Sequence, residues 1–463
     1  MLKLFNTLTR KIADFEPIND KKVGIYSCGP TVYWNQHIGH MYAYVQWDVL
    51  VRLLKVDGFD VKWVMNITDV GHMTGDNEGD ADTGEDKMEK GAKREGLSVW
   101  EIAEKYMKQF ISSMDLLNIQ KPDILCKATD HINEIIELIK KIENRGFTYK
   151  TKTGLVFDTG KFPEYADFSK LNLEKQSAGA RVEVDPEKKK PWDFLLWVTN
   201  QPEHIMLWDS PWGKGFPGWH IECTAMSTKY LGEKFDIHTG GREHIPVHHT
   251  NEIAQAFGAY GTQTANYWLH NDWLVIDGQK MSKSLGNNVL VTDLQEKGFD
   301  PLALRYLILT SHYRQGINFT WESLEGAQSA LDNLRAEIRA WDQPKIGCAE
   351  FEQRFFEAAN DDLSLPKALA IMWEMVKSDL PSENKSATIL EMDKILGLKL
   401  DEFLGKKIEV PEEVKKLIEE RETVRKAGDF KKSDELRHEI EKLGFEIEDT
   451  ASGSKIKYMS SRT

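Results

Sequence analysis

The sequence predicts an α/β protein with a Rossmann-like parallel sheet at its centre. A short apolar strand at residues 23–27 leads into a helix at 39–54, where apolar residues recur at helical spacing. A second apolar strand at 61–67 follows Gly58, which ends this helix. Such a strand–helix–strand unit is the building block of the parallel sheets that bind nucleotides.

The segments that follow this unit are more varied. Residues 76–86 are polar, glycine-rich and acidic, which is typical of a loop. Helical periodicity predicts helices at 99–117 and 131–145, and alternation over 148–158 predicts a hairpin. Residues 211–223 contain several Gly and Pro residues, so we expect a structured loop there rather than a helix.

The second half of the sheet gives way to helices. A strand at 235–238 ends at two glycines, and a helix at 249–257 and a strand at 273–276 follow it. Residues 301–404 are largely helical in pattern, and a proline then opens a small C-terminal unit at 411. This unit reads as a helical pair with a strand-like tail.

Composition excludes several classes of protein. The net charge of −14 argues against a protein that coats nucleic acid through bulk charge. The N-terminal residues lack a secretory pattern, and no run of apolar residues is long enough to span a membrane. The four cysteines lie far apart, so free or metal-bound thiols are expected rather than a disulfide framework. We therefore expect a cytoplasmic protein.

Two histidines at the start of the first helix are candidates for binding phosphate. His37 and His40 are three residues apart, so both imidazoles can face one ligand. Gly39 between them allows a base or ribose to approach the backbone, and the helix N-terminus adds N–H donors and a positive dipole. Taken alone, such a pair is more often two surface histidines.

A loop late in the sequence changes this interpretation. Residues 280–284 read Lys-Met-Ser-Lys-Ser and follow a strand. Two lysines and two hydroxyls on a loop form a suitable clamp for phosphates. Such a clamp can bind the transition state better than the ground state. The two motifs together predict an ATP site with catalytic residues on both sides of the nucleotide. These residues are His37, His40, Lys280 and Lys283.

Two cysteines, a histidine and a glutamate are candidate metal ligands. They are Cys28, Cys223, His248 and Glu252. His248 and Glu252 share a helix face, and thiolate, imidazole and carboxylate groups are all reasonable zinc ligands. Spacing alone does not decide between His248 and His249, and it does not bring the two cysteines together. On these residues alone, buried cysteines and a capping histidine would be the commoner explanation.

The motifs and their surroundings resemble one family, the cysteinyl-tRNA synthetases, which belong to the class I aminoacyl-tRNA synthetases. The likeness runs from residue 1 to the C-terminal tail. The matching segments are residues 26–33 (Tyr-Ser-Cys-Gly-Pro-Thr-Val-Tyr), 66–69, 128–132, 193–194, 210–213, 217–223 (Pro-Gly-Trp-His-Ile-Glu-Cys), 280–287, 313–315 and 318–321.

The resemblance implies a site for each substrate. It assigns one zinc ion to Cys28, Cys223, His248 and Glu252, and an amino-acid pocket to Gly29, Thr68 and Trp219. It also implies an ATP site made of His37, Gly39, His40, Gly240, Gly241, Glu243 and Lys283, with Mg²⁺ accompanying the nucleotide. Glu243 stands beside the expected ribose site, where an Asp is frequent in the family. Zinc binds a thiolate far better than a hydroxyl, so the metal would distinguish cysteine from serine.

The resemblance also divides the chain into units. Residues 1–120 and 216–320 would form the two halves of the catalytic domain, with a connective insertion at 121–215. Residues 321–405 would form a helical bundle and residues 406–463 an anticodon-binding module. The implied partners are ATP, L-cysteine and cysteine tRNA, with no membrane, and the protein is expected to act as a monomer.

Two other functions remain open at this point. A related ligase joins activated cysteine to an amino sugar and shares the ATP motifs and the zinc chemistry, but it typically lacks an anticodon module. A non-catalytic paralogue that binds nucleotide or tRNA is the third possibility, and the intact His37, His40, Lys283 and zinc ligands argue against it.

Overall fold

The computed structural model describes residues 1–74, 85–170, 186–281, 287–406, 410–450 and 453–458. Its centre is a parallel five-stranded sheet with the strand order β13-β12-β3-β4-β7. The strands are β3 (Lys22–Ser27), β4 (Asp60–Ile67), β7 (Ile124–Lys127), β12 (Phe235–Gly241) and β13 (Ala265–Asn271). The chain adds β4 and β7 on one side of β3, and β12 and β13 on the other. The direction in which strands are added therefore reverses between β3 and β12. In sheets of this kind, ligands bind outside the carboxyl ends of the strands where this reversal occurs.

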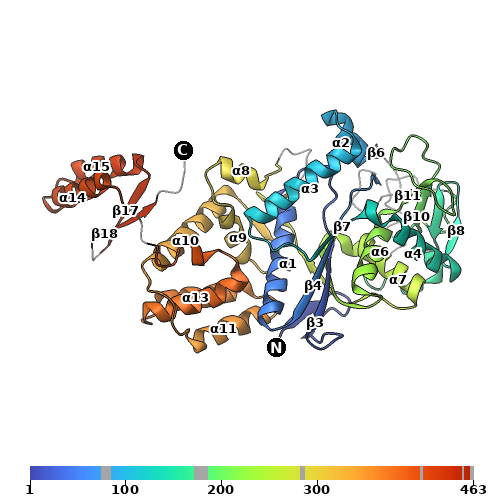
Figure 1. Cartoon of the computed structure of the whole chain (residues 1–463), viewed down its shortest axis with the longest axis horizontal. Helices are drawn as coiled ribbons and strands as arrows, with labels where there is room; N and C mark the ends of the chain where they lie inside the picture. Colours follow the sequence, from blue (N-terminus) through green and yellow to red (C-terminus); the bar gives the residue numbers. More distant parts are fainter. Residues whose placement is uncertain (75–84, 171–185, 282–286, 407–409, 451–452, 459–463) are drawn as a thin grey trace.

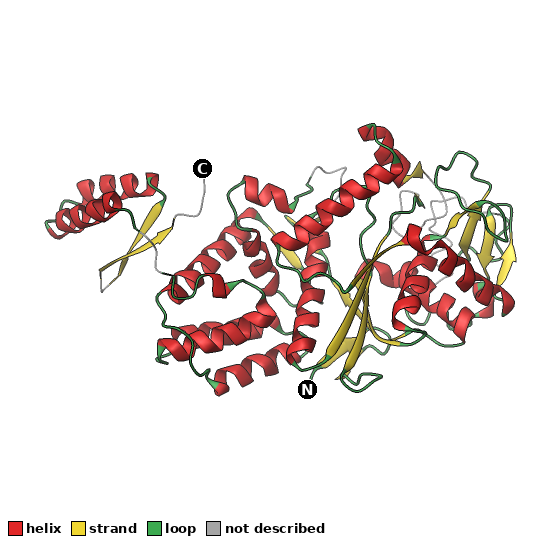
Figure 2. Ribbon diagram, in the orientation of Figure 1, coloured by secondary structure: helices red, strands yellow, loops and turns green. Residues whose placement is uncertain are grey.

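Helices cover both faces of the sheet, as Figures 1 and 2 show. The helix α1 (Ile38–Val56) packs against β4 on one face. The helix α6 (Trp219–Leu231) packs against β4 on the other side of the sheet. The helices α4 (Ile132–Asn144) and α7 (Thr250–Tyr260) pack against α6. Thirteen residues of α1 are buried, which explains the almost continuous apolar pattern of its sequence.

The predicted insertion carries an antiparallel sheet of four strands, in the order β11-β10-β9-β8. The strands are β8 (Thr148–Lys150), β9 (Gly154–Phe157), β10 (Phe194–Thr199) and β11 (Gly215–Pro217). The pairing of β8 with β9 confirms the hairpin predicted from alternation. Smaller sheets are formed by β1 (Lys3–Asn6) with β2 (Lys11–Asp14), by β5 (Met73–Thr74) with β6 (Glu85–Asp86), and by β14 (Leu274–Ile276) between β15 (Gln279–Lys280) and β16 (Ile317–Phe319).

The remaining chain is mostly helical, as predicted. The helices α8 (Val291–Glu296) and α9 (Pro301–Leu309) lead to α10 (Trp321–Arg339), α11 (Ala349–Asn360), α12 (Leu365–Lys377) and α13 (Ser382–Leu396). The C-terminal unit holds α14 (Glu412–Lys426), α15 (Phe430–Lys442) and the hairpin of β17 (Phe445–Thr450) and β18 (Gly453–Tyr458). None of the helices in the described part of the chain combines the length and apolar character needed to cross a bilayer.

One local prediction was wrong, and some elements were not predicted. Residues 211–223 are not all loop, because α6 begins at Trp219 and carries Cys223 on its second turn. Gly218, the residue before the helix, has an extended backbone, so the Gly- and Pro-rich stretch ends where the helix starts. The helix α2 (Lys87–Glu95), which precedes α3 (Val99–Leu116), was not predicted. The α2 sequence is mostly charged and has only two apolar side chains, Met88 and Ala92, which are too few to predict a helix.

Candidate functional site

The candidate site lies where the strand order reverses. Cys28 directly follows β3, and its backbone N–H donates to the carbonyl of Thr239 on β12 (3.1 Å). The glycines Gly240 and Gly241 end β12 on the neighbouring strand. Residues from both halves of the sheet therefore meet at the carboxyl edge, as the topology requires.

The two predicted ATP motifs lie together although they are far apart in sequence. A Cβ atom on Gly39 would lie 2.3 Å from Cε of Met281, so the methionine of the late loop packs directly on this glycine. The backbone N–H of Ile38 donates to the carbonyl of Val289 (2.9 Å), just beyond the same loop. These contacts place Met281 and Val289, on either side of residues 282–286, against the N-terminus of α1.

The two histidines of the first motif stack on each other at this helix end. The His37 and His40 rings lie 3.6 Å apart with an interplanar angle of 18°, and His37 is the residue that precedes the first turn of α1. Both side chains are partly or fully exposed. Of the lysines, Lys280 ends β15, whereas Lys283 lies outside the described residues.

The four predicted metal ligands converge on one point. One ligand atom from each of Cys28, Cys223, His248 and Glu252 lies within 4.8 Å of the others. The four come from the end of β3, from α6, from a π-helical turn at Ile245–His249 and from α7. Each is buried, with 1 to 8% of its surface exposed. Spacing could not bring Cys28 near Cys223, but the adjacency of β3 and α6 does.

The pKa shifts of the candidate ligands are consistent with a site that binds a cation. Burial raises the pKa of Cys28 well above its usual range, and the neighbouring Cys223 and Glu252 raise it further. Burial also lowers the pKa of His248 well below its ordinary value, so its imidazole is neutral, which is the form that binds metals. Zinc replaces thiol protons on binding, and it would remove the cost of burying these thiolates. The donor set is therefore chemically suited to zinc.

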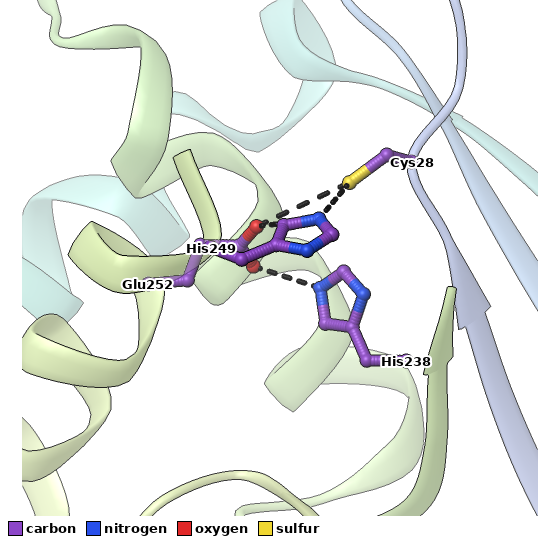
Figure 3. A group of neighbouring side chains, drawn as sticks. All are labelled: Cys28, His238, His249 and Glu252. Carbon is purple, nitrogen blue, oxygen red and sulfur yellow. Dashed lines mark hydrogen bonds and ion pairs between the residues drawn. The ribbon is translucent and has the colours of Figure 1, made fainter. Parts of the chain in front are cut away.

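A second set of four residues overlaps the first and appears in Figure 3. It keeps Cys28 and Glu252 but includes His238 and His249, again with ligand atoms within 4.8 Å. Nε2 of His249 lies 3.3 Å from Sγ of Cys28, and Nε2 of His238 lies 3.0 Å from Oε2 of Glu252. The choice between His248 and His249 that spacing left open thus becomes a choice between two sets, and only the first contains both thiols.

Further histidines orient the predicted ligands. Nδ1 of His220 lies 2.9 Å from Nδ1 of His248, which leaves Nε2 of His248 on the side of Glu252, at 3.2 Å. Desolvation by burial lowers the pKa of His220 to about 3, so this ring is neutral. Supporting hydrogen bonds of this kind fix the tautomer and direction of a metal-binding histidine.

The predicted amino-acid pocket adjoins the metal ligands. The half-buried ring of Trp219 lies 4.9 Å from the ring of His248. Oγ1 of Thr68 accepts from Nδ2 of Asn66 (3.0 Å), whose side-chain oxygen in turn accepts from the backbone N–H of Gly29 (2.7 Å). A Cβ on Gly29 would overlap the Asn66 carbonyl, so only glycine fits there. Asn66 thus links the two pocket residues.

The predicted adenosine cradle lies beside these groups. A Cβ on Gly240 would clash with the ring of His249 (2.6 Å), and one on Gly241 would clash with the carboxylate of Glu243 (2.2 Å). The buried ring of His249 therefore requires a glycine at position 240, whereas the exposed end of Glu243 could move away from a Cβ at position 241. Glu243 itself is exposed.

Sequence reasoning missed a buried carboxylate beside the pocket. Glu222 is fully buried on α6, and its two oxygens contact Nε2 of His72 (2.8 Å) and Oγ1 of Thr68 (3.3 Å). It also missed the contacts of His238 and His220. A Glu or His within an otherwise apolar helix or strand can be recognised in a sequence as a buried polar residue. The sequence does not show which residue it contacts.

Family models match both ends of this architecture. One described as "tRNA synthetases class I (C) catalytic domain" matches residues 14–329, and another described as "Cysteinyl-tRNA ligase anticodon binding domain" matches residues 408–455. The first match alone covers more than half of the chain.

Curated relatives match over nearly their whole length. The chain is 46% identical to cysteine–tRNA ligase 1 of Burkholderia lata, with 98% of this chain and 96% of the relative covered. It is 46% identical to the cysteine–tRNA ligase of Treponema denticola (97% and 98% covered) and 42% identical to that of Thermus thermophilus (98% and 98%).

A solved structure supports the fold independently. The methionyl-tRNA synthetase of Mycobacterium tuberculosis, in complex with methionyl-adenylate, matches with a TM-score of 0.54 at 16% identity. The match covers 81% of this chain and 90% of that one. The predicted fold class is confirmed, and the chain belongs to the cysteine–tRNA ligase family of class I aminoacyl-tRNA synthetases.

Proposed function

We propose that this protein activates L-cysteine with ATP and transfers it to cysteine tRNA. The observation that carries the proposal is the convergence of two thiols, an imidazole and a carboxylate at the carboxyl edge of the sheet. One of these ligands, Cys28, lies on the same connection from β3 to α1 that leads to Gly39 and its contact with Met281. The similarity over the full length of named cysteine–tRNA ligases agrees with this reading.

The reaction has two steps that balance without a protein nucleophile. The cysteine carboxylate attacks the α-phosphorus of Mg²⁺-ATP, which forms cysteinyl-adenylate and releases pyrophosphate. A ribose hydroxyl of the terminal adenosine of the tRNA then takes the cysteinyl group and releases AMP. Positioning and charge neutralisation dominate this chemistry.

Each predicted group has a place in these steps. His37 and His40, stacked at the N-terminus of α1, would donate to the phosphates together with the helix N–H groups. Lys280 and Lys283 would neutralise the charge that develops on the phosphates. Thr68 and Trp219 would hold the amino acid, and Gly240 and Gly241 would let the adenosine approach the backbone.

The proposed metal site would use Cys28, Cys223, His248 and Glu252. Zinc bound there would supply a direct ligand bond to the thiolate of cysteine, which the hydroxyl of serine cannot match. Around it, His220 and His238 hold His248 and Glu252 in position through the contacts described above. The monomeric state and the cytoplasmic location expected from the sequence stay predictions.

One pair of assays tests this function. We expect ATP–pyrophosphate exchange that depends on cysteine and not on serine, followed by charging of cysteine tRNA. Transfer of cysteine to an amino sugar instead would identify the alternative ligase. Binding of nucleotide or tRNA with no exchange would identify a non-catalytic paralogue.

The Lys283→Ala variant tests the clamp predicted from the late loop. Removal of one charge that stabilises a transition state typically costs about a hundredfold in rate. We therefore expect cysteine-dependent exchange to fall about a hundredfold with an unchanged circular dichroism spectrum. Exchange near the wild-type rate would remove Lys283 from the mechanism.

Removal of residues 406–463 tests the predicted anticodon-binding module. The core of this unit draws on its own residues, Val414, Ile418, Ile440, Phe445 and Ile447, so the deletion leaves the two larger cores intact. We expect tRNA binding to weaken about tenfold or more and to lose part of its salt dependence, because phosphate contacts are lost. Cysteine-dependent exchange in the same variant is the control and should change less than about twofold. Unchanged tRNA affinity would contradict the assignment of this unit.

A further inference from the structure

Glu243 belongs to a small cluster of polar and aromatic side chains at the edge of the proposed nucleotide site. Its carboxylate lies over the α-carbon of Gly241, where a Cβ would come within 2.2 Å of Oε1 and 2.4 Å of Oε2. The indole N–H of Trp273 donates to Oε2 at 2.9 Å. Glu243 and Trp273 come from different segments, one after β12 and one after β13, and both are exposed.

The tryptophan itself is held at several points. Its backbone carbonyl accepts from the N–H of Ile317 (3.1 Å), and its own N–H donates to Oδ1 of Asp272 (2.8 Å). The guanidinium of Arg242 lies 4.9 Å from the centre of the indole ring and donates to Oδ2 of Asp272 (2.7 Å). Asp272 therefore contacts both the backbone N–H of Trp273 and the guanidinium of Arg242 that lies over the indole ring. These contacts give the indole N–H a defined direction.

This arrangement has a consequence for the carboxylate. An exposed glutamate has many accessible rotamers and loses side-chain entropy when a ligand fixes it. Trp273 holds Oε2, and the whole carboxylate lies against the backbone of Gly241, in the glycine pair that ends β12. A carboxylate held in one direction beside a glycine turn is suited to accept hydrogen bonds from the hydroxyls of a ribose.

We propose that Trp273 is a positioning residue for nucleotide recognition, which fixes Glu243 so that it accepts from the ribose hydroxyls of ATP. This inference rests on the proposed function in that it takes ATP as the substrate. Arg242 and Asp272 act through Trp273 by holding its ring and its backbone.

The test compares ATP with 2′,3′-dideoxy-ATP, which lacks both ribose hydroxyls but keeps the reacting phosphates. Cysteine-dependent pyrophosphate exchange is measured with each nucleotide in the wild type, Trp273→Phe, Glu243→Ala and the double variant. The Trp273→Phe change keeps an aromatic ring beneath Arg242 and removes only the donor. Trp100→Phe, at an exposed tryptophan on α3, is the matched control.

We expect Trp273→Phe to lower kcat/KM for ATP about tenfold and to leave that for the dideoxynucleotide within about twofold. The control should leave both values unchanged. Glu243→Ala should remove most of the preference for ATP, and adding Trp273→Phe to it should have little further effect, because the two residues act as one unit. A merely structural role for Trp273 would lower both rates together.

Two results would overturn the inference. One is an unchanged preference for ATP in Trp273→Phe, and the other is an effect of this change that adds fully to that of Glu243→Ala. Absence of exchange in the wild type would instead count against the proposed function. In that case, calorimetric titration of the same variants with the two nucleotides still decides whether Trp273 contributes to ribose recognition.

Discussion

The Cys223→Ser variant is expected to lose its bound metal and to activate cysteine about a thousandfold more slowly. Changes at groups that merely support a metal ligand typically cost about 10–100-fold, so loss of a ligand should cost more. Serine is nearly isosteric, but its hydroxyl is a poor zinc ligand. Cys223 is 1% exposed within α6, which leaves little room for water to replace the sulfur.

The measurement has a metal readout and a rate readout. Elemental analysis of the wild type should find about one zinc per chain, and the variant should retain little of it after dialysis against a weak chelator. Cysteine-dependent pyrophosphate exchange is then measured on the same samples. A variant that keeps its exchange rate without zinc would contradict the metal assignment.

Cys126→Ser provides the matched control for this variant. Cys126 is also buried (4% exposed), but it lies on β7 and belongs to neither candidate set of metal ligands. Its Sγ donates to the carbonyl of Met65 (3.5 Å), a role that a serine hydroxyl can keep. This change should leave both zinc content and exchange close to wild type. The overlapping set with His238 and His249 predicts the opposite for Cys223, namely that its loss leaves the metal bound.

The sequence was most informative about the fold where periodicity and glycines agree. The buried positions of α1 recur along the helix. The two apolar runs on either side of this helix predicted the strands β3 and β4, which pair in the structure. Prediction failed at α6, whose Gly- and Pro-rich approach resembles a loop, because the sequence pattern does not mark where the chain turns from one conformation to the other.

The site illustrates a different limit of sequence reasoning. The spacing of His248 and Glu252 within one turn predicts that they share a face, and Nε2 and Oε1 indeed lie 3.2 Å apart. The approach of Cys28 to Cys223, or of Met281 to Gly39, depends on the order of strands in the sheet. The family resemblance predicted that Cys28 and Cys223 share a metal site, and the two ATP motifs predicted one nucleotide site. The contact of Met281 with Gly39 was not predicted. The Trp273 and Glu243 pair was not predicted, since neither residue lies in a recognisable spacing with the other.

The second large effect is expected at a fully buried ion pair between two helices that are far apart in the sequence, α1 and α9. Asp48 on α1 and Arg305 on α9 are both 0% exposed, and their Oδ2 and Nη2 atoms lie 2.6 Å apart. The same guanidinium donates from Nε to the carbonyl of Leu396 at the end of α13 (2.6 Å) and from Nη1 to that of Leu117 after α3 (3.0 Å). Arg305 thus connects four helices.

The Asp48→Asn variant should lose about 3–5 kcal/mol of stability, because it removes the carboxylate that hydrogen-bonds to the buried guanidinium of Arg305. It also removes the ion pair of Asp48 with Arg52 (2.7 Å). Burial lowers the pKa of Arg305, but a guanidinium stays charged in proteins, so the variant cannot escape the cost by losing a proton. We expect the first transition in urea to move to clearly lower denaturant. The exposed pair of Asp115 with Lys121 offers a control, and Asp115→Asn should change stability by less than about 0.5 kcal/mol.

The double variant Asp48→Asn, Arg305→Met separates a buried charge from a lost contact. Removal of both charges leaves no unpaired guanidinium at position 305, which can restore part of the stability that one-sided removal costs. We expect the double variant to be more stable than Asp48→Asn alone. If it is less stable, the hydrogen bonds of Arg305 to the backbone of α13 carry the energy, and Asp48 serves mainly to orient them. If Asp48→Asn itself unfolds at the wild-type midpoint, the pair contributes nothing to holding the bundle against α1.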